Sequence, residues 1–204
     1  MRDVEKALID IADIRSRIAA TTTFRGFGPH ALGLTGILAL SCALWQHLSG
    51  VDAVTDPLGF FLTWIVVAVV CVSLVGAEVI VRSRRHHGGM ADQMIHQAIQ
   101  QFLPAGAAGA ALAAILGRFA PEAIWLLPGV WALFVSLGLF AAVPSLPRGA
   151  MLAGGWYFVS GCVVLMLAAP EGAISPFMMG LPFAVGQFLL AAIVHRASGD
   201  DDAA

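Results

Sequence analysis

The sequence predicts an all-α, polytopic membrane protein with six transmembrane helices in short antiparallel hairpins. Hydrophobic residues make up 59% of the 204 residues, and charged residues make up only 12%. Soluble domains carry roughly 25% charged residues, so this composition places the chain among the integral membrane proteins. The apolar residues fall into six runs, each close to the roughly 20 residues that a helix needs to cross about 30 Å of hydrocarbon. Short connections between the runs indicate one compact membrane domain.

The first element in the chain is a predicted amphipathic helix over residues 1–20. Its apolar residues recur in steps of three and four, which is the spacing of one helix face. These residues are Val4, Leu8, Ile11, Ile14 and Ile18. Its acidic and basic residues cancel, whereas helices that bind anionic lipid are usually rich in Lys and Arg. We therefore expect it to dock on a partner helix or on the cytoplasmic face of the protein itself, with the membrane surface as the alternative.

The domain organisation follows from these segments. Residues 1–28 form the N-terminal helix and its connector, residues 29–197 form the membrane domain, and residues 198–204 form a predicted disordered acidic tail. Gly28 is followed by Pro29, and proline suits the first position of a helix. The six spans are predicted at residues 30–48, 58–81, 97–117, 123–143, 150–169 and 177–195.

The basic residues predict the orientation of the spans. Cytoplasmic loops of membrane proteins carry an excess of Lys and Arg. If the N-terminus is cytoplasmic, every Lys and Arg residue except Arg118 lies on the cytoplasmic side. The sequence therefore predicts a multi-pass protein of the inner cell membrane with both termini in the cytoplasm.

The third span and its approach, residues 91–118, have the most unusual composition. Polar residues recur at helical spacing in the first half, and after Pro104 the sequence is almost entirely Ala and Gly. Small residues let neighbouring helix backbones approach closely in membranes. We therefore expect this helix to be an inner helix around which the rest of the bundle is organised.

The two halves of the chain show a faint internal repeat. When the first three spans are aligned with the last three, Gly36 falls on Gly129 and Pro104 falls on Pro182. Because three is an odd number of spans, the two halves would have opposite orientations, as in the 3+3 inverted repeats of many transporters. The alternative is chance matching, since spans rich in Ala, Leu and Gly align easily with one another.

Prolines at corresponding places in two such halves point to a transport site. We expect the third and sixth spans to cross near the membrane midplane and to enclose a polar cavity. The predicted binding residues are His96, Gln97, Gln100, Gln101, Pro104, Pro182 and Gln187. A buried amide without partners costs about 1–3 kcal/mol, so these side chains must meet each other, water or a ligand. The alternative is that the amides only hold helices together.

Glu78, near the inner end of the second span, has two interpretations. An acid inside a membrane span can be a proton or cation site. It can also form an ion pair with Arg82, one helical turn later. The spacing of four residues favours the ion pair.

Five of the six histidines lie near the predicted cytoplasmic face, which leaves a metal or haem site as an alternative. They are His30, His86, His87, His96 and His195. No two of them lie deep in different spans, as a membrane haem would require. The three cysteines, Cys42, Cys71 and Cys162, lie inside apolar runs and are interpreted as small core residues. We therefore predict no metal, no cofactor and no catalytic residue.

Several function classes are excluded. Lys6 is the only lysine and lies outside every span, so a retinal Schiff base is impossible. There is no Walker A motif, no nucleophile elbow and no HExxH helix. A basic surface for nucleic acid is absent. The leading prediction is a small permease or channel embedded in the lipid bilayer. The second is a non-transporting membrane subunit or sensor that signals to a partner through residues 1–20, and an enzyme is the weakest class. Oligomers are compatible with either prediction.

Overall fold

The computed structural model of the chain describes residues 28–51, 53, 55–86, 91–143, 146–147, 149–169 and 174–202. The described residues form helices and no strand, and six helices are long and apolar enough to cross a membrane. The predicted all-α membrane fold is therefore confirmed. The elements are α2 (Pro29–Ser49), α3 (Pro57–His86), α4 (Ala91–Phe119), the 3-10 helix η2 (Pro121–Leu126), α5 (Leu127–Ala142), α6 (Ala150–Ala168) and α7 (Pro176–Asp202).

The predicted boundaries can be compared with the observed helices. Helix α2 begins at Pro29 after an extended Gly28, as the Gly-Pro pair predicted, and it ends at Gly50 in the left-handed conformation with φ 68°. Helix α7 continues to Asp202, into the segment predicted as a tail. The predicted amphipathic helix at residues 1–20 and His87 lie outside the described residues.

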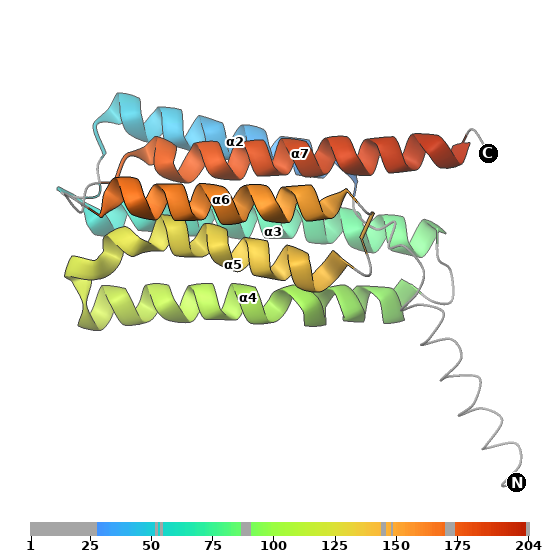
Figure 1. Ribbon diagram of the computed structural model, residues 1–204, viewed down its shortest axis with the longest axis horizontal. Helices are drawn as coiled ribbons and strands as arrows, with labels where there is room; N and C mark the ends of the chain where they lie inside the picture. Colours follow the sequence, from blue (N-terminus) through green and yellow to red (C-terminus); the bar gives the residue numbers. More distant parts are fainter. Residues whose placement is uncertain are drawn as a thin grey trace, which may run out of the picture.

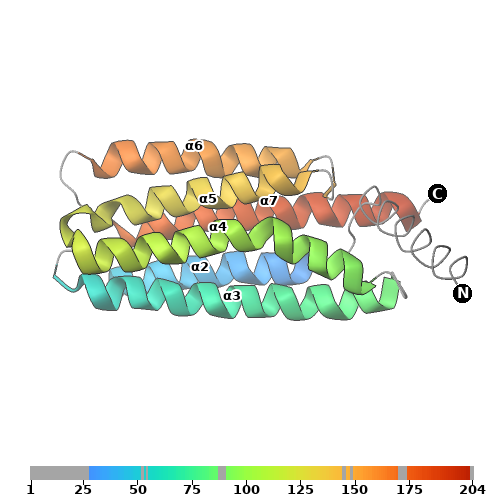
Figure 2. The same cartoon turned by 90° about the horizontal axis from the view of Figure 1, so that it is seen from below.

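The six long helices run along the molecule in alternating directions (Figures 1 and 2). The start of α2, the end of α3 and the end of α7 therefore lie together, at what we call the Arg82 end. The end of α4 and the helix η2 lie at the opposite end, which we call the Arg118 end. Arg82 and Arg196 thus lie at one end and Arg118 at the other, in line with an asymmetric distribution of positive charge.

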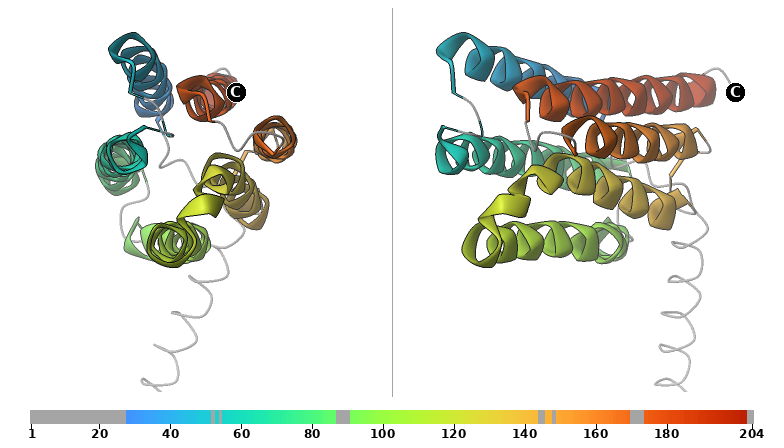
Figure 3. Two further views of the ribbon diagram at one scale, coloured as in Figure 1. Left: turned by 90° about the vertical axis from the view of Figure 1, so that its left-hand side faces the viewer. Right: turned by 60° about the vertical axis from the view of Figure 1, so that its left-hand side comes forward.

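Viewed end-on, the helices form a ring in the order α2, α7, α6, α5, α4, α3 (Figure 3, left). Each helix packs against its two neighbours in this ring, and α5 also contacts α7. Helices α4 and α7 lie on opposite sides. This arrangement decides which of the predicted site residues can meet.

Close helix packing by small residues occurs in two pairs, α2 with α7 and α5 with α6. A Cβ atom added at Gly180 would lie 2.5 Å from the Cβ of Ala43. A Cβ atom added at Gly129 would lie 2.8 Å from the carbonyl oxygen of Gly161, and the reverse distance is the same. These pairs show the close backbone approach that small residues permit in membrane bundles.

Helix α4 is the least covered span, which corrects the prediction that it is the inner helix. Only 6% of its apolar stretch is buried, against 22–39% in the other spans. Its small residues mostly face outward, since a Cβ at Gly106 or Gly117 would have no atom within 4 Å. Gly109 instead faces Trp131 of α5, and Ala105 lies near Gly138 of α5. The Ala- and Gly-rich composition predicted that the helix could pack closely, but not that neighbours would use that surface.

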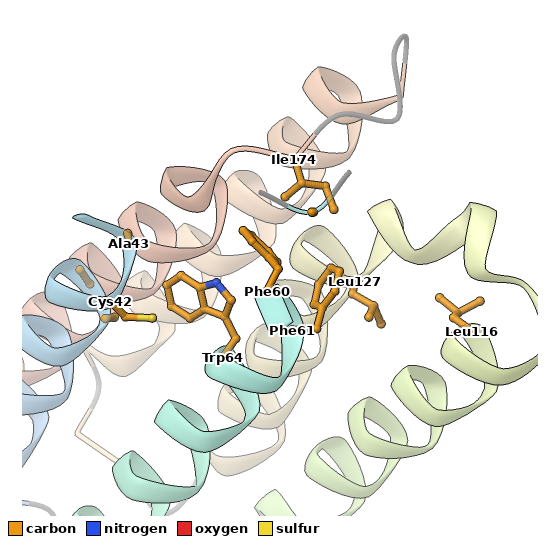
Figure 4. Close-up of a cluster of buried hydrophobic side chains, with 11 residues drawn as sticks. Cys42, Ala43, Phe60, Phe61, Trp64, Leu116, Leu127 and Ile174 are labelled. Atoms are coloured by element: carbon orange, nitrogen blue, oxygen red, sulfur yellow. The ribbon is translucent and has the colours of Figure 1, made fainter. Parts of the chain in front are cut away.

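The buried core has two parts. The first lies toward the Arg118 end, where Phe60, Phe61 and Trp64 of α3 project among the other helices (Figure 4). The second lies toward the Arg82 end and is centred on Tyr157 of α6, which is fully buried. Each part contains one polar side-chain network, and these two networks are the basis of the site described next.

Candidate functional site

Three of the residues predicted on the third span, His96, Gln100 and Pro104, do not line the interior. His96 and Gln100 are exposed on α4, and their Nε2 atoms lie 2.9 Å apart. Pro104 is also exposed, Gln101 is partly buried, and the side chain of Gln97 lies outside the described residues. The polar stripe is therefore on a helix whose outer face is open.

The predicted crossing of the third and sixth spans is not present in the structure. Helix α4 packs against α3, α5 and η2, whereas α7 packs against α2, α6 and α5. Gln187 and Pro182 of α7 are therefore not brought together with Gln100 and Pro104 of α4. The sequence could not indicate this, because apolar spans carry little information about which of them are neighbours.

Gln187 instead takes part in a polar network between α6 and α7. The hydroxyl of Tyr157 donates to the carbonyl oxygen of Phe183 at 3.2 Å. The Nε2 of Gln187 donates to the Tyr157 hydroxyl oxygen at 3.3 Å. The backbone of Gly186 lies directly against the Tyr157 ring, which leaves no room for a side chain there. Sequence analysis identified Gln187 but missed Tyr157, because a single tyrosine near a span end is usually an interfacial residue.

Pro182 lies beside this network. Proline has no N–H group, so the carbonyl of Met178, four residues earlier, loses its helical donor. The indole Nε1 of Trp156 donates to the carbonyl oxygen of Pro182 at 2.9 Å. Two consecutive side chains of α6, Trp156 and Tyr157, thus bind two consecutive carbonyls of α7 and hold the helix at its proline.

Two buried polar atoms in this region have no hydrogen-bond partner among the described residues: Oε1 of Gln187 and Oγ of Ser136. Ser136 of α5 is completely buried. Hydroxyl groups in helices commonly donate to a carbonyl one turn earlier. Thr35, Thr63, Ser73 and Ser160 all do so here. Ser136 is therefore a buried hydroxyl whose hydrogen-bonding capacity is unused.

Contacts between the paired helices place four of these side chains at similar depth. Gly36 of α2 meets Phe188 and Ala184 of α7, so the adjacent residues Thr35 and Gln187 lie at the same level. We call Thr35, Ser136, Tyr157 and Gln187 the polar layer.

Ser136 and Tyr157 are aligned by the packing of α5 against α6. These antiparallel helices meet at Gly129 with Gly161 and again at Phe140 with Gly154. Ser136 and Tyr157 lie between these two contacts on their respective helices. All the residues of the polar layer lie within spans, away from the helix ends.

The charged side chains that the structure describes lie at the two ends and not in the polar layer. At the Arg82 end, Arg82 Nη1 lies 3.9 Å from Oε1 of Glu78, which supports the ion pair that the spacing favoured. Glu78 Oε2 also accepts from the backbone N–H of Ala31 at 3.1 Å. A carboxylate at the N-terminus of α2 is stabilised by the helix dipole. Glu78 is thus occupied in joining α3 to the start of α2.

A second amide within the spans, Gln46 of α2, lies nearer the Arg118 end. Its Oε1 accepts from Trp64 Nε1 at 2.8 Å, and its Nε2 donates to the carbonyl oxygen of Phe60 at 3.1 Å. Gln46 is completely buried, and both ends of its amide are paired. Sequence analysis did not identify this network, because Gln46 and Trp64 lie in different spans.

Metal-ligating residues do not gather in the part of the chain that the structure describes, where no group of three or more His, Cys, Asp and Glu side chains could hold a metal ion. His47 packs against the ring of Phe177, with centroids 5.2 Å apart. Cys42 and Cys71 are buried free thiols in the core.

Comparison with known proteins gives no relative for this arrangement. No protein-family model matches the chain, and neither the curated proteins nor the solved structures searched contain a match.

Proposed function

We propose that the protein is a small permease or channel-like protein whose solute binds at the polar layer. The observation that carries the proposal is the pair of buried, unpaired atoms, Gln187 Oε1 and Ser136 Oγ, at mid-depth in a membrane bundle. A buried polar group without a partner costs about 1–3 kcal/mol. Polar residues inside spans are expensive and usually functional.

A purely structural role explains the polar layer less well. Gln46 shows how this chain uses a glutamine for packing, since both its amide oxygen and its amide nitrogen are paired within the protein. Gln187 uses only its nitrogen, through a bond of 3.3 Å. An amide that served only to join α6 and α7 would not need an unpaired oxygen.

The proposal is tested by flux into liposomes that contain the purified full chain. A panel of small solutes, including neutral molecules, cations and anions, is mixed with the liposomes, and volume recovery is followed by light scattering. We expect at least one solute to enter faster than into protein-free liposomes, and Gln187→Leu to abolish the difference while remaining folded. Equal rates for every solute with and without protein would contradict the proposal.

We also propose that the protein lies in the inner membrane of the cell. In the proposed orientation, the Arg82 end faces the cytoplasm. The support is the positive-inside rule applied to Arg82 and Arg196 at one end and Arg118 at the other. Single cysteines introduced at Ser49, at the Arg118 end, and at Ser198, near the end of α7, should be labelled from opposite sides in intact cells. In the proposed orientation Ser49 is labelled from outside and Ser198 is protected. Labelling of Ser198 alone from outside would reverse the orientation, and labelling of both from outside would contradict the six-span topology.

The second candidate is a membrane subunit that does not transport. The observation that favours it is the open face of α4, where only 6% of the apolar stretch is buried. Helix faces made of Gly and Ala are typical of helix–helix interfaces in membranes. A subunit of this kind would co-purify with a second membrane protein under mild detergent, and the purified chain alone would show no flux.

A further inference from the structure

We infer that the solute of the polar layer is a small uncharged molecule carrying both a hydrogen-bond donor and an acceptor, with urea and small primary amides as the best fit. This inference rests on the proposed function and adds the chemical class of the solute. It follows from which atoms of the layer are free, and from the position of the described charged side chains away from the layer.

The free atoms define what the solute must offer. Gln187 Oε1 is an acceptor without a donor, so it needs an N–H or O–H group from the solute. The hydroxyl of Ser136 has both its donor and its acceptor capacity unused. A solute that bonds to both residues therefore needs at least one donor, and it gains a second bond if it also has an acceptor for the Ser136 hydroxyl.

The hydroxyl groups of Tyr157 and Thr35 already donate hydrogen bonds within the protein. The Tyr157 hydroxyl donates to Phe183 and accepts from Gln187, and the Thr35 hydroxyl donates to the carbonyl oxygen of Leu32 at 2.8 Å. The Nε2 of Gln187 has two hydrogens, and the bond to Tyr157 uses one of them. Gln187 therefore has an acceptor and one further donor on the same planar group. A planar amide or urea carries the same pair and can complement it.

The electrostatics of the layer favour a neutral solute. The charged side chains that the structure describes lie toward the ends of the helices, as Glu78 and Arg82 do at one end and Arg118 does at the other. A charge moved into an apolar interior without an opposite charge costs far more than a neutral polar group does. Neither a cation nor an anion would find a countercharge among the layer residues.

The test compares urea with guanidinium, two planar molecules of similar size. Urea is neutral and has donors and an acceptor, whereas guanidinium is charged and has donors only. Liposomes that contain the full chain are loaded with each solute and then diluted, so that the solute gradient points outward. The rate of volume change of the liposomes is measured. We expect urea to cross faster than in protein-free liposomes, and guanidinium to cross at the protein-free rate.

Two matched serine variants locate the effect at the polar layer. Ser136→Ala removes a free hydroxyl, and Ser160→Ala removes a buried hydroxyl that already donates to the Tyr157 carbonyl at 3.3 Å. We expect Ser136→Ala to slow urea flux roughly three- to tenfold, which corresponds to the loss of one hydrogen bond. Ser160→Ala should leave the rate within about twofold of the unmodified protein. Gln187→Leu is a third variant, and it should remove the urea flux altogether.

The outcomes separate the inference from the proposed function. Faster flux of guanidinium, or of another charged solute, with no flux of urea would overturn the solute class and leave the permease proposal intact. Equal effects of Ser136→Ala and Ser160→Ala would overturn the assignment of Ser136 to the site. No flux of any solute would overturn both. Size-exclusion profiles and melting temperatures of each variant show whether a lost rate reflects lost folding.

Discussion

Two glutamines within the spans of this bundle, the buried Gln46 and the partly buried Gln187, are paired differently. Gln46 is held at both ends of its amide by Trp64 and Phe60, whereas Gln187 is held only at its nitrogen by Tyr157. Both lie within membrane spans, and both are in contact with an aromatic residue of another helix. This difference indicates that the role of an amide within a membrane span depends on which of its atoms are paired within the protein. The full pairing of Gln46 fits a structural role, whereas Gln187 is the residue that we propose to bind the solute.

The largest expected effect comes from the glycine that makes room for the Gln187 network. Gly186→Ala places a methyl group against the fully buried ring of Tyr157, which cannot move without disturbing α6. Overpacking of this kind typically costs about 1–3 kcal/mol. We expect a clear fall in melting temperature. Gly106→Ala on the open face of α4 adds the same methyl group without a contact, and it should leave the melting temperature unchanged or slightly higher.

The next expected effect concerns the satisfied glutamine. Gln46→Leu leaves the buried indole N–H of Trp64 without an acceptor, at a cost of about 1–3 kcal/mol. The double variant Gln46→Leu with Trp64→Phe removes both partners, and replacing a polar pair by apolar groups can be nearly neutral. Thermal unfolding should therefore show recovery in the double variant relative to Gln46→Leu. If the losses of stability in the two single variants add up in the double variant, the hydrogen bond to Trp64 is not what Gln46 contributes to stability.

A smaller change in stability is expected for the partly paired glutamine. Gln187→Leu loses one long hydrogen bond to Tyr157 but also removes a buried acceptor that has no donor. These two effects oppose each other, so the melting temperature should change by less than in Gln46→Leu. A fall as large as that of Gln46→Leu would show that Gln187 is structural, and the contrast between the two amides would no longer hold.

The sequence predicted the parts of the structure that depend on local composition. Hydropathy and span length predicted the six membrane helices, the Gly28–Pro29 pair predicted the start of α2, and the spacing of Glu78 and Arg82 predicted their ion pair. These signals lie within one segment of the chain, where helical periodicity relates residues directly.

The pairing of the helices could not be predicted in the same way. Many combinations of apolar faces are compatible with one hydropathy pattern. The stripe on α4 was therefore predicted to line a site, although His96 and Gln100 are exposed in the structure. Ser136 gave no signal at all, because single serines are ordinary in membrane spans. Its importance follows only from burial without a partner, which requires coordinates. The pairing of Gln46 with Trp64 is likewise a contact between separate spans.

The smallest expected effect tests the polar stripe of α4 against the polar layer. Gln100 is exposed, and the contact that places it is with His96 on the same helix. Surface substitutions away from packed contacts usually change stability by less than about 0.5 kcal/mol. Gln100→Leu should therefore leave both the melting temperature and urea flux close to those of the unmodified protein, under conditions where Gln187→Leu removes the flux. If Gln100→Leu instead stops the flux at an unchanged melting temperature, the solute path includes the outer face of α4. The functional unit would then have to be an assembly in which a neighbouring chain covers that face.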